Sequence, residues 1–322
     1  MLSRRTLTIG IRVAVLGFVA VLGLAGCGPS LDGDRRPDAG DAANPNAKGE
    51  GQKVILTTFT VLADMGQNVA GDKAAVRSLV KPGAEIHGYE PTPSDLVRAQ
   101  EADLILENGL NLERWAERFY NSVPKVPHAT LSTGIEPVAI ARDAYQGKPN
   151  PHAWMSPRNA LVYVENIRKA LANLDPANAD VYARNAKTYS QQIATLDRKL
   201  REEIETLPLD RRYLVSCEGA FSYIARDYGL KEVYLWAVNS EQQATPQQIE
   251  RVIKTVKTQR IPAVFCESTV SDKAQRQVAK EANAKFGGVF FVDSLSPRDG
   301  PASTYLKLLE HNIATLLQGL SE

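Results

Sequence analysis

The sequence predicts an α/β protein of two lobes, each a mainly parallel sheet flanked by helices, joined by one long helix. From Lys53 onward, short apolar runs alternate with amphipathic stretches, a pattern typical of parallel strands connected through helices. A polar stretch from Pro176 to about Leu207 interrupts this pattern, without internal glycine or proline and with apolar residues at mostly helical spacing. At 322 residues, the chain is long enough for two domains.

The first lobe is expected over residues 53–174, where four apolar runs are typical of strands. These runs are VILTTF, VRSLV, DLILEN and, less regularly, HATL. Helices are expected to begin where a capping side chain precedes a proline, as at Thr92-Pro93 and Ser156-Pro157. Asp95 would support the first turn of the earlier of these helices.

The long helix is expected within residues 175–207, beginning near Asp175-Pro176. At the usual rise per residue, it would span about 45 Å, enough to run along both lobes as a stiff spine. A rigid connection of this kind permits smaller movements of the lobes than a pair of flexible strands would.

The second lobe is expected over residues 208–322. Its predicted strands are RYLVSC, VYLW, AVFCES and GGVFFVDS, and its predicted helices lie near 220–228, 246–258, 272–286 and 303–319. Thr245-Pro246 together with Gln248 forms a capping-box pattern at the start of the second of these helices.

Residues 1–26 have the composition of an export signal, with basic residues first and then an apolar stretch from Val13 to Leu24. This stretch is too short for a membrane-spanning helix, which needs roughly 20 apolar residues. The sequence LAGC resembles a bacterial lipoprotein cleavage box, so we expect lipidation of Cys27 and anchoring at the extracytoplasmic, periplasmic side of a membrane. An ordinary secretory signal is the alternative, and the paired arginines of SRRTLTIG leave the export route open between the general and the twin-arginine pathways.

Residues 27–52 are expected to form a flexible tether. They contain one large aliphatic residue, Leu31, among many Gly, Asp, Pro and Asn, so they cannot bury enough surface to offset the ordering of the chain. Such a tether would keep the folded body close to a membrane partner. After residue 26, the chain carries 35 basic and 37 acidic residues, which gives no reason to expect nucleic-acid binding. We expect a monomer.

Two of the four histidines, His87 and His152, lie in loops crowded with proline and glycine, KPGAEIHGYEPTPSD and KPNPHAWMSP. The prolines restrict the backbone beside each imidazole, so less conformational entropy is lost when a ligand organises the two loops. A pre-organised geometry of this kind is what a metal site requires.

Two acidic residues, Glu218 and Asp293, follow apolar runs at the predicted carboxyl ends of strands in the second lobe. Ligands of open α/β sheets bind at this edge. If the lobes face each other, two neutral imidazoles and two carboxylates meet in one cleft, and a divalent cation would neutralise the two negative charges. The affinity should then fall as the pH drops through the histidine range near about 6.5, because a protonated imidazole cannot bind a metal.

In order and context, these segments resemble the cluster A-I metal-binding lipoproteins that serve ABC importers of manganese, zinc or iron. The resemblance extends from Lys53 to Leu320 and rests on HGYEPTPSD, PHAWMSP, CEGAFSYIARDYGL, VFCESTVS, FVDSLS and GPASTYLKLLEHNIATLL. It implies two pseudo-symmetric lobes that enclose the ion, and an ABC permease with its ATPase as partners. It implies high-affinity metal capture, without enzymatic activity, by four ligands: His87, His152, Glu218 and Asp293.

Manganese is the metal that we expect, with zinc and iron as alternatives. Zinc-directed members of the resembled family usually have a histidine where this chain has Glu218, and many carry a histidine-rich loop where residues 133–149 contain no histidine. Two nitrogen and two carboxylate ligands suit Mn²⁺ or Fe²⁺ better than a three-histidine site does. Zinc would still bind tightly, because Mn²⁺ stands lowest in the affinity order for such ligands.

Cys217 and Cys266 are expected to pair in an oxidising compartment. The bond would close a loop of about 50 residues and contribute roughly 4 kcal/mol in the chain-entropy model. Because Cys217 directly precedes Glu218, two interpretations stay open: a purely stabilising disulfide, or a redox-controlled site in which reduction moves Glu218 and weakens metal binding. Equal affinity before and after thiol reduction, in a competition titration, would exclude the second.

Two other classes of function remain open. A metal-dependent hydrolase uses similar ligands but needs an open coordination position and a base, and the chain has no GxSxG, HExxH or phosphate-binding glycine loop. A surface adhesin would depend on exposed surface, so replacing His87 and Glu218 should leave adhesion intact. His128 and His311 are expected to be surface or packing residues, and Trp154 either packs in the cleft wall or screens the ion from water.

Overall fold

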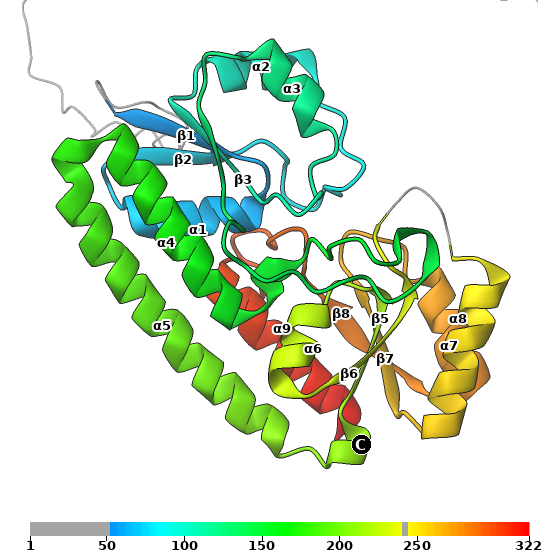
Figure 1. Cartoon of the computed structure of the whole chain (residues 1–322). Coiled ribbons are helices and arrows are strands. Elements are labelled where there is room, and N and C mark those ends of the chain that lie inside the picture. Colours follow the sequence, from blue (N-terminus) through cyan, green and yellow to red (C-terminus); the bar gives the residue numbers. More distant parts are fainter. Residues whose placement is uncertain (1–51, 240–243, 322) are drawn as a thin grey trace, which may run out of the picture. The chain divides into compact units, whose positions relative to one another are not determined.

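The computed structural model describes residues 52–239 and 244–321 (Figure 1). The expected signal segment, Cys27 and all but the last residue of the expected tether therefore lie outside the described residues. None of the helices within the described ranges combines the length and the apolar character that crossing a membrane requires.

The first lobe contains a four-stranded parallel sheet in the order β2-β1-β3-β4. Its elements are β1 (Lys53–Thr57), α1 (Thr60–Ala70), β2 (Ala74–Ser78), α2 (Pro93–Gln100), β3 (Leu104–Glu107), α3 (Ala116–Ser122) and β4 (His128–Thr130). Apolar side chains of α1, including Met65, belong to the main core, whereas Ala99 of α2 and Phe119 of α3 belong to a second, smaller core. The sheet is therefore buried on both faces, as parallel sheets generally are.

The second lobe is built from two parallel strand pairs, β5 with β6 and β7 with β8. Its elements are β5 (Tyr213–Glu218), α6 (Ser222–Tyr228), β6 (Lys231–Trp236), α7 (Pro246–Gln259), β7 (Ala263–Glu267), α8 (Lys273–Ala282), β8 (Lys285–Phe290) and α9 (Tyr305–Leu320). The buried side chain of Gln275 donates hydrogen bonds to the carbonyls of Val215 in β5 and Phe265 in β7, at 3.2 and 2.8 Å. These bonds bring the two pairs side by side.

Two helices connect the lobes, α4 (Pro157–Leu174) and α5 (Ala179–Glu205). Helix α5 buries one stripe of residues at helical spacing, namely Tyr182, Ala186, Tyr189, Ile193, Leu196, Leu200 and Ile204. It contacts the first lobe through Asn185, whose amide donates to the Val69 carbonyl, and the second lobe through Asp197, which accepts from the Tyr228 hydroxyl. At 27 residues, α5 is about 40 Å long and runs along both lobes, as Figure 1 shows.

The predicted fold class is confirmed, and the differences lie at element ends. The stretch expected to be helical over 272–286 stops at Ala282, because Asn283 adopts a left-handed conformation and β8 begins at Lys285. The stretch from Pro176 starts with a 3₁₀ turn before α5 begins at Ala179. The start of helix α1 carries no capping signal, because its N-cap is Phe59 and no side chain caps it.

Direct hydrogen bonds hold the two lobes together around the carboxyl ends of the strands. The Gly83 amide donates to the Ser294 hydroxyl at 2.6 Å, and the Leu295 amide donates to the Thr60 hydroxyl at 2.9 Å. The buried Trp154 indole donates to the Val292 carbonyl at 3.1 Å. The loops that carry the candidate site are thus fixed against each other by contacts that cross between the lobes.

Candidate metal centre

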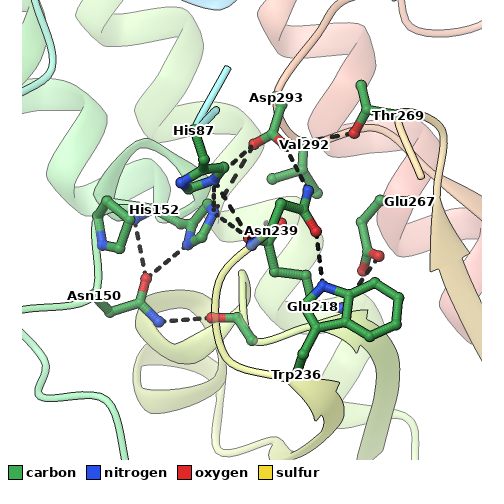
Figure 2. A network of polar contacts seen from close by, with 12 residues as sticks. His87, Asn150, His152, Glu218, Trp236, Asn239, Glu267, Thr269, Val292 and Asp293 are labelled. Atoms are coloured by element: carbon green, nitrogen blue, oxygen red, sulfur yellow. Dashed lines mark hydrogen bonds and ion pairs between the residues drawn. The ribbon is translucent and has the colours of Figure 1, made fainter. Parts of the chain in front are cut away.

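Four side chains from four separate segments converge between the lobes (Figure 2). His87 lies in the loop between β2 and α2, and His152 lies just before the short 3₁₀ turn that precedes α4. Glu218 is the last residue of β5, and Asp293 follows β8 by three residues. The residues that the sequence singled out as ligands are therefore brought together.

The potential donor atoms of these four residues all lie within 4.8 Å of one another. The two histidine Nε2 atoms are 3.1 Å apart. Glu218 Oε1 lies 3.3 Å from His87 Nε2 and 3.4 Å from His152 Nε2. Asp293 Oδ1 lies 3.8 and 3.9 Å from the same two nitrogens. Two nitrogens and two oxygens thus point at one small volume.

The candidate site is almost sealed from solvent. The side chain of His87 is 5% exposed, and those of His152, Glu218 and Asp293 are 0% exposed. Two carboxylate oxygens, Glu218 Oε2 and Asp293 Oδ1, are buried without a hydrogen-bond partner among the described residues. Leaving such atoms unpaired is costly, so a buried acid oxygen that faces two imidazoles fits a cation ligand.

Asn150 orients His152, and no sequence motif singles it out. Its side-chain oxygen accepts hydrogen bonds from the His152 backbone amide at 3.0 Å and from Nδ1 of the ring at 2.8 Å. Its amide nitrogen donates to the carbonyl of Gly219 at 2.6 Å, which fixes the orientation of the amide. The proton on Nδ1 leaves the Nε2 lone pair free for a metal.

The loop that carries His87 is held from both sides. The Glu85 carboxylate accepts the backbone amides of His87 and Gly88 at 3.0 and 2.9 Å. The Trp115 indole donates to the carbonyl of Ile86 at 3.1 Å. These bonds hold the imidazole in place without contacting it.

Asn239 contacts both acidic residues of the site and was also missed from the sequence. Its backbone amide donates to Glu218 Oε1, and its side chain donates to Asp293 Oδ2 at 3.0 Å. A third buried carboxylate, Glu267, accepts the backbone amide of Glu218 at 3.2 Å. A lone asparagine in a loop carries no distinctive sequence pattern, so only the folded structure reveals its role.

Burial shifts the pKa of every ionisable group in the site toward its neutral form. Desolvation raises the pKa of the Glu218 carboxyl and of the Asp293 carboxyl well above the usual range, and the Glu218 charge raises the latter further. It also lowers the pKa of His87, which the neighbouring His152 lowers further, and lowers the pKa of His152 to about 3. The metal-free site therefore favours neutral imidazoles and protonated acids, and a bound dication would favour ionised acids.

Cys217 and Cys266 form a disulfide between the adjacent strands β5 and β7, with a sequence separation of 49 residues. The bond directly precedes Glu218 in one strand and Glu267 in the other. The disulfide therefore links the backbone beside Glu218 to the backbone beside Glu267. The Glu267 carboxylate in turn accepts the Glu218 backbone amide.

Four other residues that the sequence singled out supply none of the four candidate donor atoms. His128 is exposed and stacks on Tyr120, and His311 donates a hydrogen bond from Nε2 to the Val289 carbonyl. The buried ring of Trp154 lies 5.2 Å from that of His152, so it packs the wall beside the site. Asp95 forms a capping box with Thr92 at the start of α2, as expected.

Comparison with known proteins finds relatives over nearly the whole described part of the chain. The protein-family model described as "Zinc-uptake complex component A periplasmic" matches residues 55–319. The chain is 53% identical over 279 residues to the iron-binding protein YfeA of Yersinia pestis, covering 87% of this chain and 89% of that protein. It is 31% identical over 275 residues to the manganese ABC transporter substrate-binding lipoprotein PsaA of Streptococcus pneumoniae, covering 83% and 89%.

Among solved structures, the fold is similar to the Mn-bound periplasmic metal binding protein from Candidatus Liberibacter asiaticus. The TM-score is 0.78 at 42% sequence identity, and the match covers 84% of this chain and 100% of that one. A likeness of this extent includes both lobes and the long helix between them.

Proposed function

Because the chain belongs to the family of zinc-uptake periplasmic components, the metal-binding components of ABC-type importers, we propose that it captures one divalent transition-metal ion through His87, His152, Glu218 and Asp293, with Mn²⁺ as the preferred cargo. The observation that carries this proposal is the convergence of four donor atoms within 4.8 Å, two from each lobe. The captured ion would then pass to a membrane permease driven by its ATPase.

The donor set supports manganese, with Fe²⁺ and Zn²⁺ as alternatives. Carboxylate oxygens favour harder ions than thiolates or a set of three histidines do. PsaA is named for manganese and YfeA for iron, and the family description names zinc. Since intrinsic affinity for Zn²⁺ exceeds that for Mn²⁺ at most nitrogen and oxygen sites, metal supply would contribute to selection in the cell.

Elemental analysis tests the identity of the cargo. Protein purified from its native envelope, without added metal or chelator, should contain about one equivalent of a single transition metal, and we expect manganese. A preparation of the Glu218→Ala variant, handled identically, is the control and should carry far less. Stoichiometric zinc or iron in the wild type would replace manganese as the cargo, and the absence of any transition metal would contradict the proposed function.

We also propose that Cys27 carries a lipid and that the segment after it is a tether. The relatives FimA and PsaA are both named as lipoproteins. A lipid anchor would hold the folded part of the chain near its permease at a high effective concentration. Replacing Cys27 with serine should move the protein from the membrane fraction to the soluble fraction of the producing cell. Unchanged membrane association of this variant would contradict lipidation at Cys27.

A capture role fits the site better than hydrolysis does. Four protein donors occupy most of the coordination shell of a metal, whereas a catalytic metal such as zinc typically has three protein ligands and keeps a position for water. Glu267, a further buried carboxylate beside the site, accepts the Glu218 backbone amide through Oε2, which supports the backbone of a candidate ligand. We therefore propose that the chain is not an enzyme.

A further inference from the structure

We propose, building on the metal site proposed above, that Asn239 limits Asp293 to a single coordinating oxygen and thereby sets the preference of the site between Zn²⁺ and Mn²⁺. Asn239 lies between β6 and α7, is 3% exposed, and faces the two acidic candidate ligands (Figure 2). It does not supply a donor atom to the ion. Its role is to position the residues that do.

The orientation of the Asn239 amide follows from its neighbours. The Trp236 indole donates a hydrogen bond to Asn239 Oδ1 at 2.8 Å. An indole N–H can only donate, so the amide oxygen must face Trp236. The amide nitrogen then faces Asp293 Oδ2, to which it donates at 3.0 Å. Trp236 therefore fixes which end of the amide meets Asp293.

The two oxygens of Asp293 have different surroundings. Oδ2 accepts from Asn239 and, more weakly at 3.5 Å, from the Thr269 hydroxyl, so two protein donors already engage this oxygen. Oδ1 has no hydrogen-bond partner among the described residues and is the oxygen that faces the two imidazoles. Asp293 can thus offer a metal one oxygen only.

Glu218 is not restricted in the same way. Its Oε1 accepts the backbone amide of Asn239 and lies close to both histidines, whereas Oε2 is buried without a partner in the described part of the chain. The four residues therefore supply four donor atoms, or five if Glu218 binds through both oxygens. Four donors suit tetrahedral Zn²⁺, and a fifth, from Glu218, brings the site closer to the larger number of oxygen donors that Mn²⁺ favours.

Removing the side-chain amide should release Asp293 Oδ2 for the ion. The Asn239→Ala variant keeps the backbone donor to Glu218 and loses the side-chain donor to Asp293, together with the oxygen that accepts from the Trp236 indole. We expect its Zn²⁺ affinity to fall about 10- to 100-fold, the usual effect of removing a group that orients a metal ligand. The Mn²⁺ affinity should fall less, because the additional oxygen compensates, so the ratio of the two affinities should shift toward Mn²⁺ by about tenfold.

Competition titrations with Zn²⁺ and Mn²⁺ measure this ratio, and the visible absorption of the Co²⁺-loaded protein reports the coordination number directly. The absorption of Co²⁺ weakens as its coordination number rises, so the Asn239→Ala spectrum should be less intense than that of the wild type. Asn185→Ala is the matched control, because it removes an amide that donates to the Val69 carbonyl in the first lobe. Its affinity ratio and Co²⁺ spectrum should match those of the wild type.

Two further variants keep the test decisive if Asn239→Ala does not fold. Trp236→Phe retains a ring but removes the N–H that orients the amide, and Thr269→Val removes the second donor to Asp293. Both should shift the affinity ratio in the same direction, by less than Asn239→Ala does. Equal losses of Zn²⁺ and Mn²⁺ affinity, with an unchanged Co²⁺ spectrum, would overturn the role of Asn239. A wild-type protein that binds none of these ions would refute the metal site itself.

Discussion

Replacing His152 with alanine should remove most of the thermal stabilisation that Mn²⁺ gives the folded protein. The His152 imidazole is fully buried, and its Nε2 lies among the other three candidate donor atoms. At a free metal concentration about 1,000 times the dissociation constant, binding adds roughly 4 kcal/mol to the stability of the folded state. A 100-fold loss of affinity would remove about 2.7 kcal/mol of that amount. Thermal melts with and without Mn²⁺ measure the difference.

The matched control for this experiment is His128→Ala, which removes an exposed histidine that stacks on Tyr120 in the first lobe. This variant should keep the full metal-induced rise in melting temperature. His152→Ala without metal should still melt cooperatively, so that the loss is one of binding. An unchanged rise in His152→Ala would exclude this histidine from the site.

The sequence was sufficient for the fold class and for singling out the four residues that the structure brings together, because both depend on local sequence patterns. The apolar runs that form β1, β3, β5 and β7 are buried over all or nearly all of their length. Continuous apolar runs of this kind are readily predicted as strands of a parallel sheet. The ligands stand in segments with distinctive neighbours, such as the prolines around His152. The helix starts at Pro93, Pro157 and Pro246 were predictable because a capping residue precedes each proline.

The residues that orient the ligands were not predictable in the same way. Asn150 and Asn239 act through hydrogen bonds to groups that are distant in the sequence, such as the Gly219 carbonyl and the Asp293 carboxylate. Asparagine is common in loops for reasons of backbone geometry alone, so its type and place carry little information. Only tertiary structure distinguishes an asparagine that holds a ligand from one that forms a turn.

The electrostatics of the site depend on burial, which the sequence does not specify. Ordinary histidine pKa values predict that acid weakens metal binding by protonating the imidazoles. Burial instead lowers the pKa of both histidines, that of His152 to about 3, and raises the pKa of the Glu218 and Asp293 carboxyls. The protons that compete with the ion therefore reside on the acids.

Metal binding should consequently release protons from the carboxyls, and the affinity should rise with pH through the elevated pKa values of Glu218 and Asp293. Calorimetric titrations with Mn²⁺ in buffers of different ionisation enthalpy measure the number of protons released. The Glu218→Gln variant should release fewer protons, because one of the two acids no longer titrates. Binding without proton release at neutral pH would contradict the elevated carboxyl pKa values.

The stability of the metal-free protein should respond to pH in the opposite sense. An acid whose pKa is raised on folding contributes stability that is fully present below its unfolded value, about 4, and is lost as the pH rises through its folded value. The buried histidines act the other way, since their lowered pKa costs stability only below about 6.5. Above that pH the acids dominate, so the metal-free protein should lose stability as the pH rises. The Mn²⁺-loaded protein should lose less, since burial also raises the pKa of Glu113 and of Glu232 to about 7 and these acids titrate in both forms. The difference between the two melting temperatures should therefore widen as the pH rises above about 6.5, and a constant difference would show that the ion does not replace protons on Glu218 and Asp293.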